Sequence, residues 1–103
     1  MNGMEIWHNP RCSKSRAAKQ RLDDNNIEYT ERRYLDDAPT AQELDHVLKL
    51  LNQEPWEIAR KKEPAYPSEL EHDRAKWIAH MVANPSLIER PIIIDGDSAH
   101  IER

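Results

Sequence analysis

The segment MEIWHNPRCSKSRAAKQRL covers residues 4–22 and contains the first predicted strand and helix. Residues 4–7 predict a short strand, and the proline-containing stretch 8–11 predicts a turn. From about residue 12 to residue 22 the composition of Ala, Lys, Arg and Leu favours a helix. A second strand is predicted over residues 27–35. A strand–helix–strand unit within one sheet implies parallel strands joined by a right-handed crossover.

The middle of the chain carries helical patterns. Residues 40–43 form a Thr-Ala-Gln-Glu capping box, and one helical face then collects the apolar residues Leu44, Val47, Leu48 and Leu51. A short helix is predicted at 55–60, and a second capping box at 68–71. A further helix ends at Asn84-Pro85, and its apolar stripe comprises Trp77, Ile78, Met81 and Val82.

The C-terminal segment predicts a hairpin. Residues 91–94 predict a strand, Asp95-Gly96 is a tight-turn signal, and residues 98–102 form the returning strand. The order is therefore β-α-β, a helical insert at about residues 40–84, and a β-hairpin. This order is typical of an α/β fold with a thioredoxin-like mixed sheet. A length of 103 residues is that of one domain, so we expect a single domain over residues 1–103.

Composition excludes several classes of function. A net charge of −4 argues against a general polyanion binder, so no nucleic-acid partner is expected. No stretch approaches the roughly 18 apolar residues of a membrane helix, and the N-terminus lacks the pattern of a signal peptide. We therefore expect no membrane association and a cytoplasmic location. Two glycines cannot build a Walker loop or a dinucleotide-binding fingerprint, and no bound cofactor is expected.

The candidate chemistry concentrates at Cys12. As the single cysteine it excludes an internal disulfide and any Cys-rich zinc site. It lies where the first helix begins, and the positive end of a helix dipole stabilises a thiolate and attracts oxyanions. His8 lies nearby, and the surrounding cations are Arg11, Lys14 and Arg16. We interpret Cys12 as a reactive thiol in an anion pocket; the alternative is an inert, buried cysteine.

The residues that follow Cys12 argue against two other kinds of cysteine site. Ala18 occupies the position at which a tyrosine-phosphatase loop requires arginine. Ser15 stands where a dithiol thioredoxin has its second cysteine, which leaves a Cys-x-x-Ser monothiol arrangement. Such a thiol can attack an electrophile, but it needs an external thiol to resolve the product.

The sequence resembles the ArsC-type arsenate reductase family along its whole length. The resemblance begins with the loop HNPRCSKSR at residues 8–16 and continues through RKKE at 60–63 with Tyr66. It includes MVANP at 81–85, LIERPI at 87–92 and the terminal IER at 101–103, in which Glu102 replaces a more usual glycine.

This resemblance implies a mechanism. The Cys12 thiolate attacks arsenate, glutathione attacks the adduct, glutaredoxin takes part, and arsenite is released. The family's three oxyanion-binding arginines correspond to Arg60, Arg90 and Arg103. His8 is then expected to lower the thiol pKa, and Ser15 to stabilise the thiolate by hydrogen bonding. Thioredoxin-like folds carry a cis proline facing the active-site cysteine, and Pro91 occupies that place.

Two alternatives stay open at this point. Related Spx-type proteins share the fold and bind RNA polymerase as redox-responsive regulators, although their CxxC switch is absent here because Ser15 replaces the second cysteine. A monothiol transfer protein acting on glutathionylated substrates would need the same low-pKa thiol. A metal site is not expected, because no third ligand accompanies the Glu43/His46 or Glu69/His72 pairs.

Overall fold

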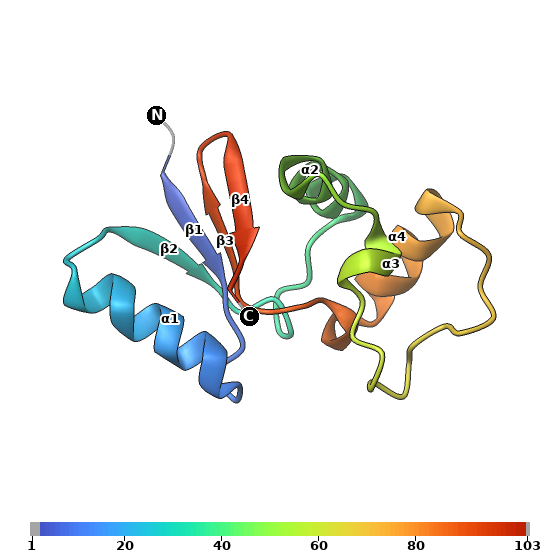
Figure 1. Cartoon of the computed structure of the whole chain (residues 1–103), viewed down its shortest axis with the longest axis horizontal. Helices are drawn as coiled ribbons and strands as arrows, with labels where there is room; N and C mark the ends of the chain where they lie inside the picture. The colour runs from blue at the N-terminus through green and yellow to red at the C-terminus, as the bar shows by residue number, and fades with distance from the viewer. Residues whose placement is uncertain (1–2, 103) are drawn as a thin grey trace. The chain divides into compact units, whose positions relative to one another are not determined.

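The computed structural model describes residues 3–102. Contacts divide the chain into two compact units, which we call the sheet unit (residues 1–37 and 90–103) and the helical unit (Ala38–Glu89). Both are shown in Figure 1. The helical insert expected at about residues 40–84 lies inside the helical unit. The assignment of residues 1–103 to one domain stays a prediction.

The sheet unit contains four strands: β1 (Met4–Trp7), β2 (Tyr29–Arg32), β3 (Ile92–Asp95) and β4 (Ser98–Ile101). They are arranged in the order β2-β1-β3-β4. β1 pairs in parallel with β2, while the β1–β3 and β3–β4 pairs are antiparallel. The predicted β-α-β unit and C-terminal hairpin in a mixed sheet are therefore confirmed.

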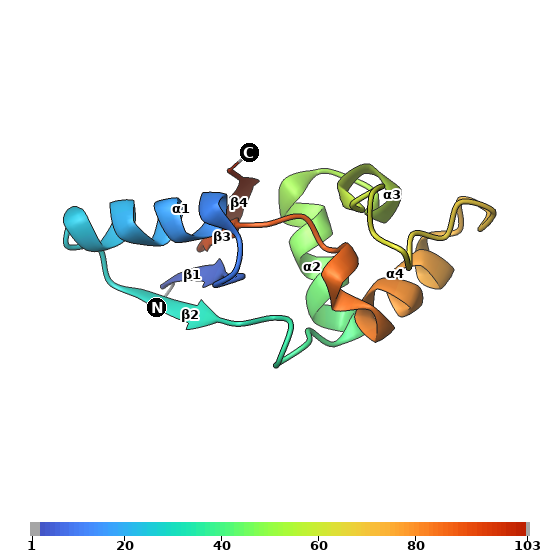
Figure 2. The same cartoon turned by 90° about the horizontal axis from the view of Figure 1, so that it is seen from below.

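Helix α1 (Ser13–Asp24) covers one face of this sheet, as Figure 2 shows. Its Ala18 and Leu22 pack with Ile6 of β1 and Ile93 of β3 in a buried cluster. Asn26 after the helix adopts a left-handed conformation with φ of 56°, which asparagine tolerates better than most residues. The apolar face of α1 thus orients the helix start, where Cys12 lies, at one end of the sheet.

β2 is shorter than the predicted strand over residues 27–35. Ile27 is 39% exposed and Leu35 is 36% exposed, so neither gains the burial that would favour extending the strand. A turn begins at Arg33, whose carbonyl accepts hydrogen bonds from the N–H groups of Asp36 and Asp37. Strand-forming residue types at both ends therefore did not determine how far the pairing with β1 extends.

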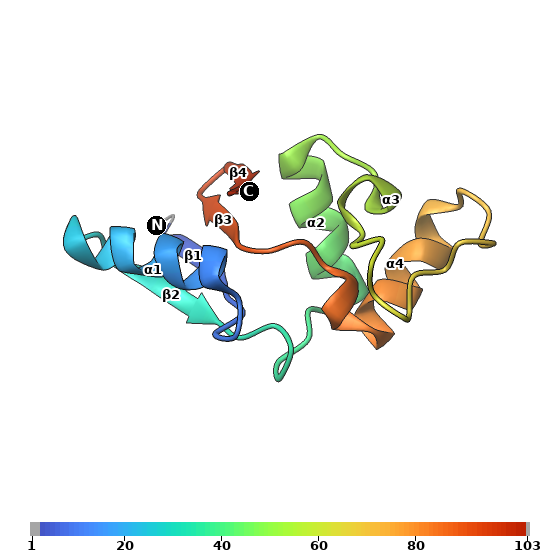
Figure 3. The ribbon, with the colours of Figure 1, turned by 60° about the horizontal axis from the view of Figure 1, so that its bottom comes forward.

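The helical unit comprises α2 (Ala41–Leu51), α3 (Pro55–Ile58), α4 (Arg74–Ala83) and a short 3₁₀ turn, η1 (Pro85–Leu87). Figure 3 shows α2, α3 and α4 in this unit, and α4 contacts both other helices. The capping box before α2 is confirmed: Thr40 Oγ1 accepts from Glu43 N–H at 3.1 Å, and Glu43 accepts from Thr40 N–H at 2.9 Å. The predicted core residues Leu44, Val47 and Leu48 are buried.

The second predicted capping box, at residues 68–71, is wrong. That stretch forms turns, with Leu70 N–H donating to the Pro67 carbonyl. α4 begins later, after Asp73, whose carboxylate accepts from Lys76 N–H at 3.1 Å. Asp73 satisfies a first-turn N–H group, that of Lys76, next to the apolar stripe of α4, so the helix starts there. Within the described residues, no helix is both long and apolar enough to span a bilayer.

Candidate active site

The loop between β1 and α1 is held by several hydrogen bonds. At the end of β1, His8 N–H donates to the Arg32 carbonyl at 2.8 Å. The Asn9 side chain accepts from Arg11 N–H at 3.0 Å, and the Asn9 carbonyl accepts from Cys12 N–H at 3.0 Å. These bonds turn the chain through Pro10 and present Cys12 at the start of α1.

Cys12 is the N-cap residue of α1 and is partly exposed. Arg90 Nε donates a hydrogen bond to Cys12 Sγ at 3.2 Å. Burial by itself raises the pKa of the thiol, but the N–H groups of Ser15 and Lys14 and the Arg90 guanidinium outweigh it, so the pKa of Cys12 is lower than usual. The arrangement favours a thiolate that remains accessible to a reagent.

His8 and Ser15 form a buried pair next to this loop. His8 Nδ1 and Ser15 Oγ are 2.6 Å apart, and Ser15 Oγ also accepts from Asn9 N–H at 3.0 Å. Burial holds the pKa of His8 below its usual 6.5, with Lys19, Arg33 and Arg16 adding to the effect and Glu31 opposing it. In the neutral tautomer with its proton on Nε2, His8 accepts at Nδ1 and the Ser15 hydroxyl donates to it.

The structure thus gives Ser15 two separate contacts. Its backbone N–H acts on the Cys12 sulfur, while its hydroxyl is used by His8 and Asn9. Sequence reasoning expected the serine to stabilise the thiolate by hydrogen bonding, and the structure places that interaction on the main chain. His8 contacts the loop through its hydrogen bond with Ser15, and its lowered pKa disfavours a positive charge on the ring near neutral pH.

Arg90 and Pro91 come from the segment that enters β3. The Arg90–Pro91 peptide bond is cis, the conformation expected at this place in a thioredoxin-like fold. Pro91 is buried, and its carbonyl accepts from Glu102 N–H at 3.1 Å. This segment brings the Arg90 side chain against Cys12 although the two residues are far apart in sequence.

The other candidate cations come from several parts of the chain. Arg60 belongs to the helical unit, where its guanidinium contacts Glu63 at 3.1 Å and the Ser86 carbonyl at 3.4 Å. Arg103 lies outside the described residues. The possible supporting cations, Arg11, Lys14 and Arg16, are exposed. Arg16 Nη1 donates to the Pro10 carbonyl at 2.9 Å and so braces the loop.

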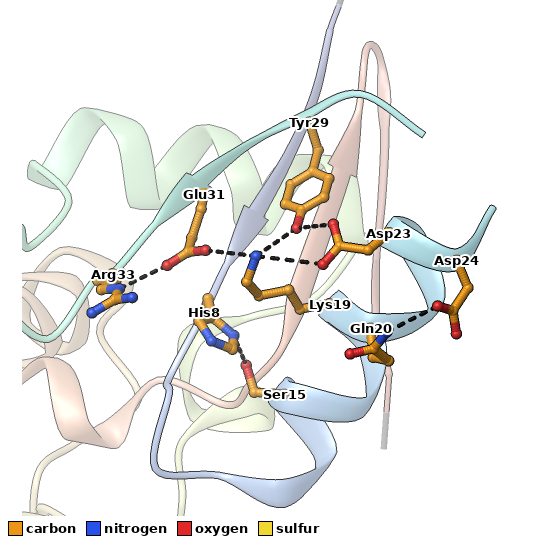
Figure 4. Close-up of polar contacts among 9 residues, drawn as sticks. All are labelled: His8, Ser15, Lys19, Gln20, Asp23, Asp24, Tyr29, Glu31 and Arg33. Atoms are coloured by element: carbon orange, nitrogen blue, oxygen red, sulfur yellow. Dashed lines mark hydrogen bonds and ion pairs between the residues drawn. The ribbon is translucent and has the colours of Figure 1, made fainter. Parts of the chain in front are cut away.

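A charged cluster beneath α1 was missed by sequence reasoning. Figure 4 shows Lys19 Nζ surrounded by oxygen atoms of Tyr29, Glu31 and Asp23. Two signals were present in the sequence. Ser15, Lys19 and Asp23 recur every fourth residue on one helix face, and Tyr29 and Glu31 alternate along one strand face. Between residues 3 and 102, no three potential ligand side chains gather in a way that would hold a metal ion.

The proteins similar to this chain include arsenate reductases and uncharacterized proteins. The model of the ArsC family matches residues 7–103. An uncharacterized protein from the glnII region of Streptomyces viridochromogenes is 43% identical over 106 residues, covering 95% of this chain and 88% of that protein. The arsenate reductase of Haemophilus influenzae is 34% identical over 103 residues, covering 95% of this chain and 89% of that enzyme.

The fold agrees with that of a solved arsenate reductase structure. An arsenate reductase from Vibrio cholerae superimposes with a TM-score of 0.90 at 30% identity, covering 97% of this chain and 89% of that chain. The predicted thioredoxin-like fold class is therefore confirmed.

Proposed function

Because this chain belongs to the ArsC family, we propose that it is a thiol oxidoreductase that reduces arsenate with glutathione as the electron donor. The observation that carries the proposal is the hydrogen bond from Arg90 Nε to Cys12 Sγ at 3.2 Å. A guanidinium at that place stabilises the thiolate and stands beside any anion the thiolate attacks. A multiply charged oxyanion must be neutralised before an anionic sulfur can approach it.

The first step forms a covalent adduct. The Cys12 thiolate attacks the As(V) centre of arsenate, a sulfur–arsenic bond forms, and an oxygen leaves as water after protonation. In this proposal Arg60, Arg90 and Arg103 bind the oxyanion, as the family resemblance implies. Arg11, Lys14 and Arg16 add positive charge near the thiol. The loop bonds from His8 and Ser15 hold the sulfur in position.

The second step needs sulfur from solution, because Cys12 is the single cysteine of the chain. A glutathione thiolate attacks Sγ of the adduct, and a disulfide bond forms. The sulfur–arsenic bond breaks with its electron pair left on arsenic, which becomes As(III) and leaves as arsenite. Glutaredoxin and further glutathione then reduce the mixed disulfide and regenerate the thiolate. This chemistry fits the cytoplasm, where such thiols are kept reduced.

The deciding experiment measures arsenite release by the purified protein with glutathione and glutaredoxin. We expect turnover that requires glutathione, poor support by thioredoxin alone, and none in Cys12→Ser. Ser13→Ala is a matched control, because Ser13 is exposed in the same helix turn. Mass spectrometry should trap the arsenylated or glutathionylated Cys12. Full turnover with thioredoxin and no small thiol would contradict the mechanism.

Further assays on the same purified protein test the two alternatives, monothiol transfer and RNA polymerase binding. Absence of arsenate turnover under every thiol supply, with cleavage of glutathionylated protein substrates, would favour a monothiol transfer protein. Capture of RNA polymerase by the intact chain, dependent on the oxidation state of Cys12, would favour an Spx-like regulator.

A further inference from the structure

A row of polar side chains runs along one face of the sheet beneath α1. In the parallel pairing of β1 with β2, Met4 lies opposite Tyr29 and Ile6 lies opposite Glu31. Alternation therefore puts Tyr29 and Glu31 on the face that carries Ile6, which is the face that α1 covers. His8 follows Ile6 at the same two-residue spacing. Its Nδ1 meets Ser15 of α1, as Figure 4 shows.

Lys19 joins α1 to this row. Its Nζ lies 2.7 Å from Tyr29 Oη, 3.2 Å from Glu31 Oε1 and 3.7 Å from Asp23 Oδ2. The bonds to Tyr29 and Glu31 raise the pKa of Lys19, so the ammonium stays charged. Because Ser15 and Lys19 are one helical turn apart, the same helix face carries both the partner of His8 and the partner of Glu31.

The Glu31 carboxylate is held from two sides. Arg33 Nε donates to Glu31 Oε2 at 2.7 Å, and Lys19 contacts the other oxygen. The bond from Arg33 lowers the pKa of Glu31, with Lys19 adding to the effect, so the carboxylate is ionised at neutral pH. Its side chain is 22% exposed, which leaves the charge partly shielded from water.

His8 experiences charges of both signs from the elements around it. The cations acting on it are Lys19 and Arg16 of α1 and Arg33 beyond β2, and the anion opposing them is Glu31 of β2. A neutral His8 with its proton on Nε2 accepts at Nδ1 from the Ser15 hydroxyl, whereas a protonated His8 donates from Nδ1 to Ser15 Oγ. Since that oxygen also accepts from Asn9 N–H, the direction of the bond decides where the hydroxyl hydrogen points.

We propose that Glu31 is a positioning residue of the Cys12 site: its carboxylate, fixed between Lys19 and Arg33, determines with His8 the direction of the His8–Ser15 hydrogen bond in the Cys12 loop. Glu31 acts through His8 and Ser15 and does not touch the sulfur. The inference rests on the proposed function in one respect, namely that Cys12 is the reacting thiol. Lys19 takes part by holding Glu31 and by opposing its effect on His8.

The first test is an NMR titration of the His8 ring, assigned with His8→Asn. Glu31→Gln should move the His8 midpoint to lower pH, because the charge that favours imidazolium is gone. Lys19→Met should move it to higher pH. Asp23→Asn is the matched control, because it removes an equal negative charge from beside the same lysine. Asp23 lies two helical turns from Ser15 along α1, whereas Lys19 lies one turn away. An unmoved midpoint in Glu31→Gln, or an equal shift in Asp23→Asn, would overturn the proposal.

The second test follows Cys12 itself through the pH dependence of its alkylation by iodoacetamide. Glu31→Gln should alter this pH profile in the otherwise unchanged protein and leave it unaltered in a His8→Asn background. A purely structural role would lower thermal stability without moving either profile. Persistence of the Glu31→Gln effect without His8 would show a direct action on the thiol and sink the route through His8. Neither assay uses arsenate, so both remain decisive if turnover fails.

Discussion

Arg90 Nε donates its hydrogen bond directly to Cys12 Sγ, at 3.2 Å, from the far end of the sequence. The contact joins the segment entering β3 to the N-terminus of α1. It supplies a full positive charge to a sulfur that already faces the partial charges of the helix N-terminus. Removing this one side chain should therefore have a measurable effect on the thiol.

Arg90→Met should raise the pKa of Cys12, since the N–H groups of Ser15 and Lys14 then oppose burial alone. In the unchanged protein the pKa of the thiol should be lower than that of a free cysteine. Thiolate absorbance or alkylation rate against pH measures both values. Arg21→Met, which removes an exposed cation from the same unit, should leave the midpoint in place. A midpoint at or above the free-thiol value in the unchanged protein would contradict the activated thiol.

Ser15→Ala should destabilise the protein by about 1–3 kcal/mol, because buried partners lose their hydrogen bond. The methyl group leaves Asn9 N–H without its acceptor and His8 Nδ1 without its 2.6 Å partner. Denaturant unfolding measures the change in free energy. Ser13→Ala, an exposed substitution two residues earlier, should cost less than about 0.5 kcal/mol. Equal losses in both variants would show that the Ser15 contacts do not stabilise the fold.

Because the pKa of His8 is lowered, we expect the protein to lose stability on mild acidification. Its pKa in the folded chain lies below the unfolded value of 6.5 because of burial. Between those two values the unfolded chain binds more protons, so the free energy of unfolding falls as pH decreases through that window and recovers above 6.5. Denaturant unfolding at a series of pH values measures this slope. His8→Asn should lack this part of the slope; retention of the full slope would assign it to other groups.

Arg60→Ala and Arg90→Ala should each weaken the binding of arsenate or sulfate while the fold stays intact. Arg→Lys at either position should also be harmful, because a planar fork that binds two oxygens becomes a point charge. Isothermal titration calorimetry measures the affinity, and circular dichroism checks the fold. Lys61→Ala alters an exposed cation next to Arg60 and serves as the control. Unchanged affinity in both Ala variants would locate the oxyanion pocket elsewhere.

Arg11 and Lys14 should favour anionic thiol reagents over neutral ones. Both side chains are exposed beside Cys12, and neither has a carboxylate partner among residues 3–102. Lys14→Gln should slow mixed-disulfide formation with glutathione disulfide more than with a neutral disulfide, and added salt should reduce the difference. Arg21→Gln, about 10 Å further along α1 and paired with Glu102, is the control. Equal slowing for both reagents would show that charge does not guide them.

Several secondary-structure elements could be predicted from the sequence because the interactions that form them are local. The Thr40–Glu43 box closes within one helical turn, so the start of α2 was predicted correctly. The box at residues 68–71 has the same S/T-x-x-E pattern but lacks an apolar stripe directly after it, and Asp73 caps α4 instead. The ends of β2 were also misplaced, because strand length depends on what each residue buries against its neighbours.

Some features of the candidate site were likewise predictable from the sequence, and others were not. Residue order and count were enough to predict that Cys12 begins a helix, that cations are its neighbours, and that the chain has no second thiol to resolve its products. The three-dimensional structure was needed to show that Arg90 contacts the sulfur and that the Ser15 hydroxyl is hydrogen-bonded to His8. The structure also shows that Glu31 is held between Lys19 and Arg33. These contacts depend on strand register and on the packing of α1 over the sheet, which the burial of residues distant in sequence determines.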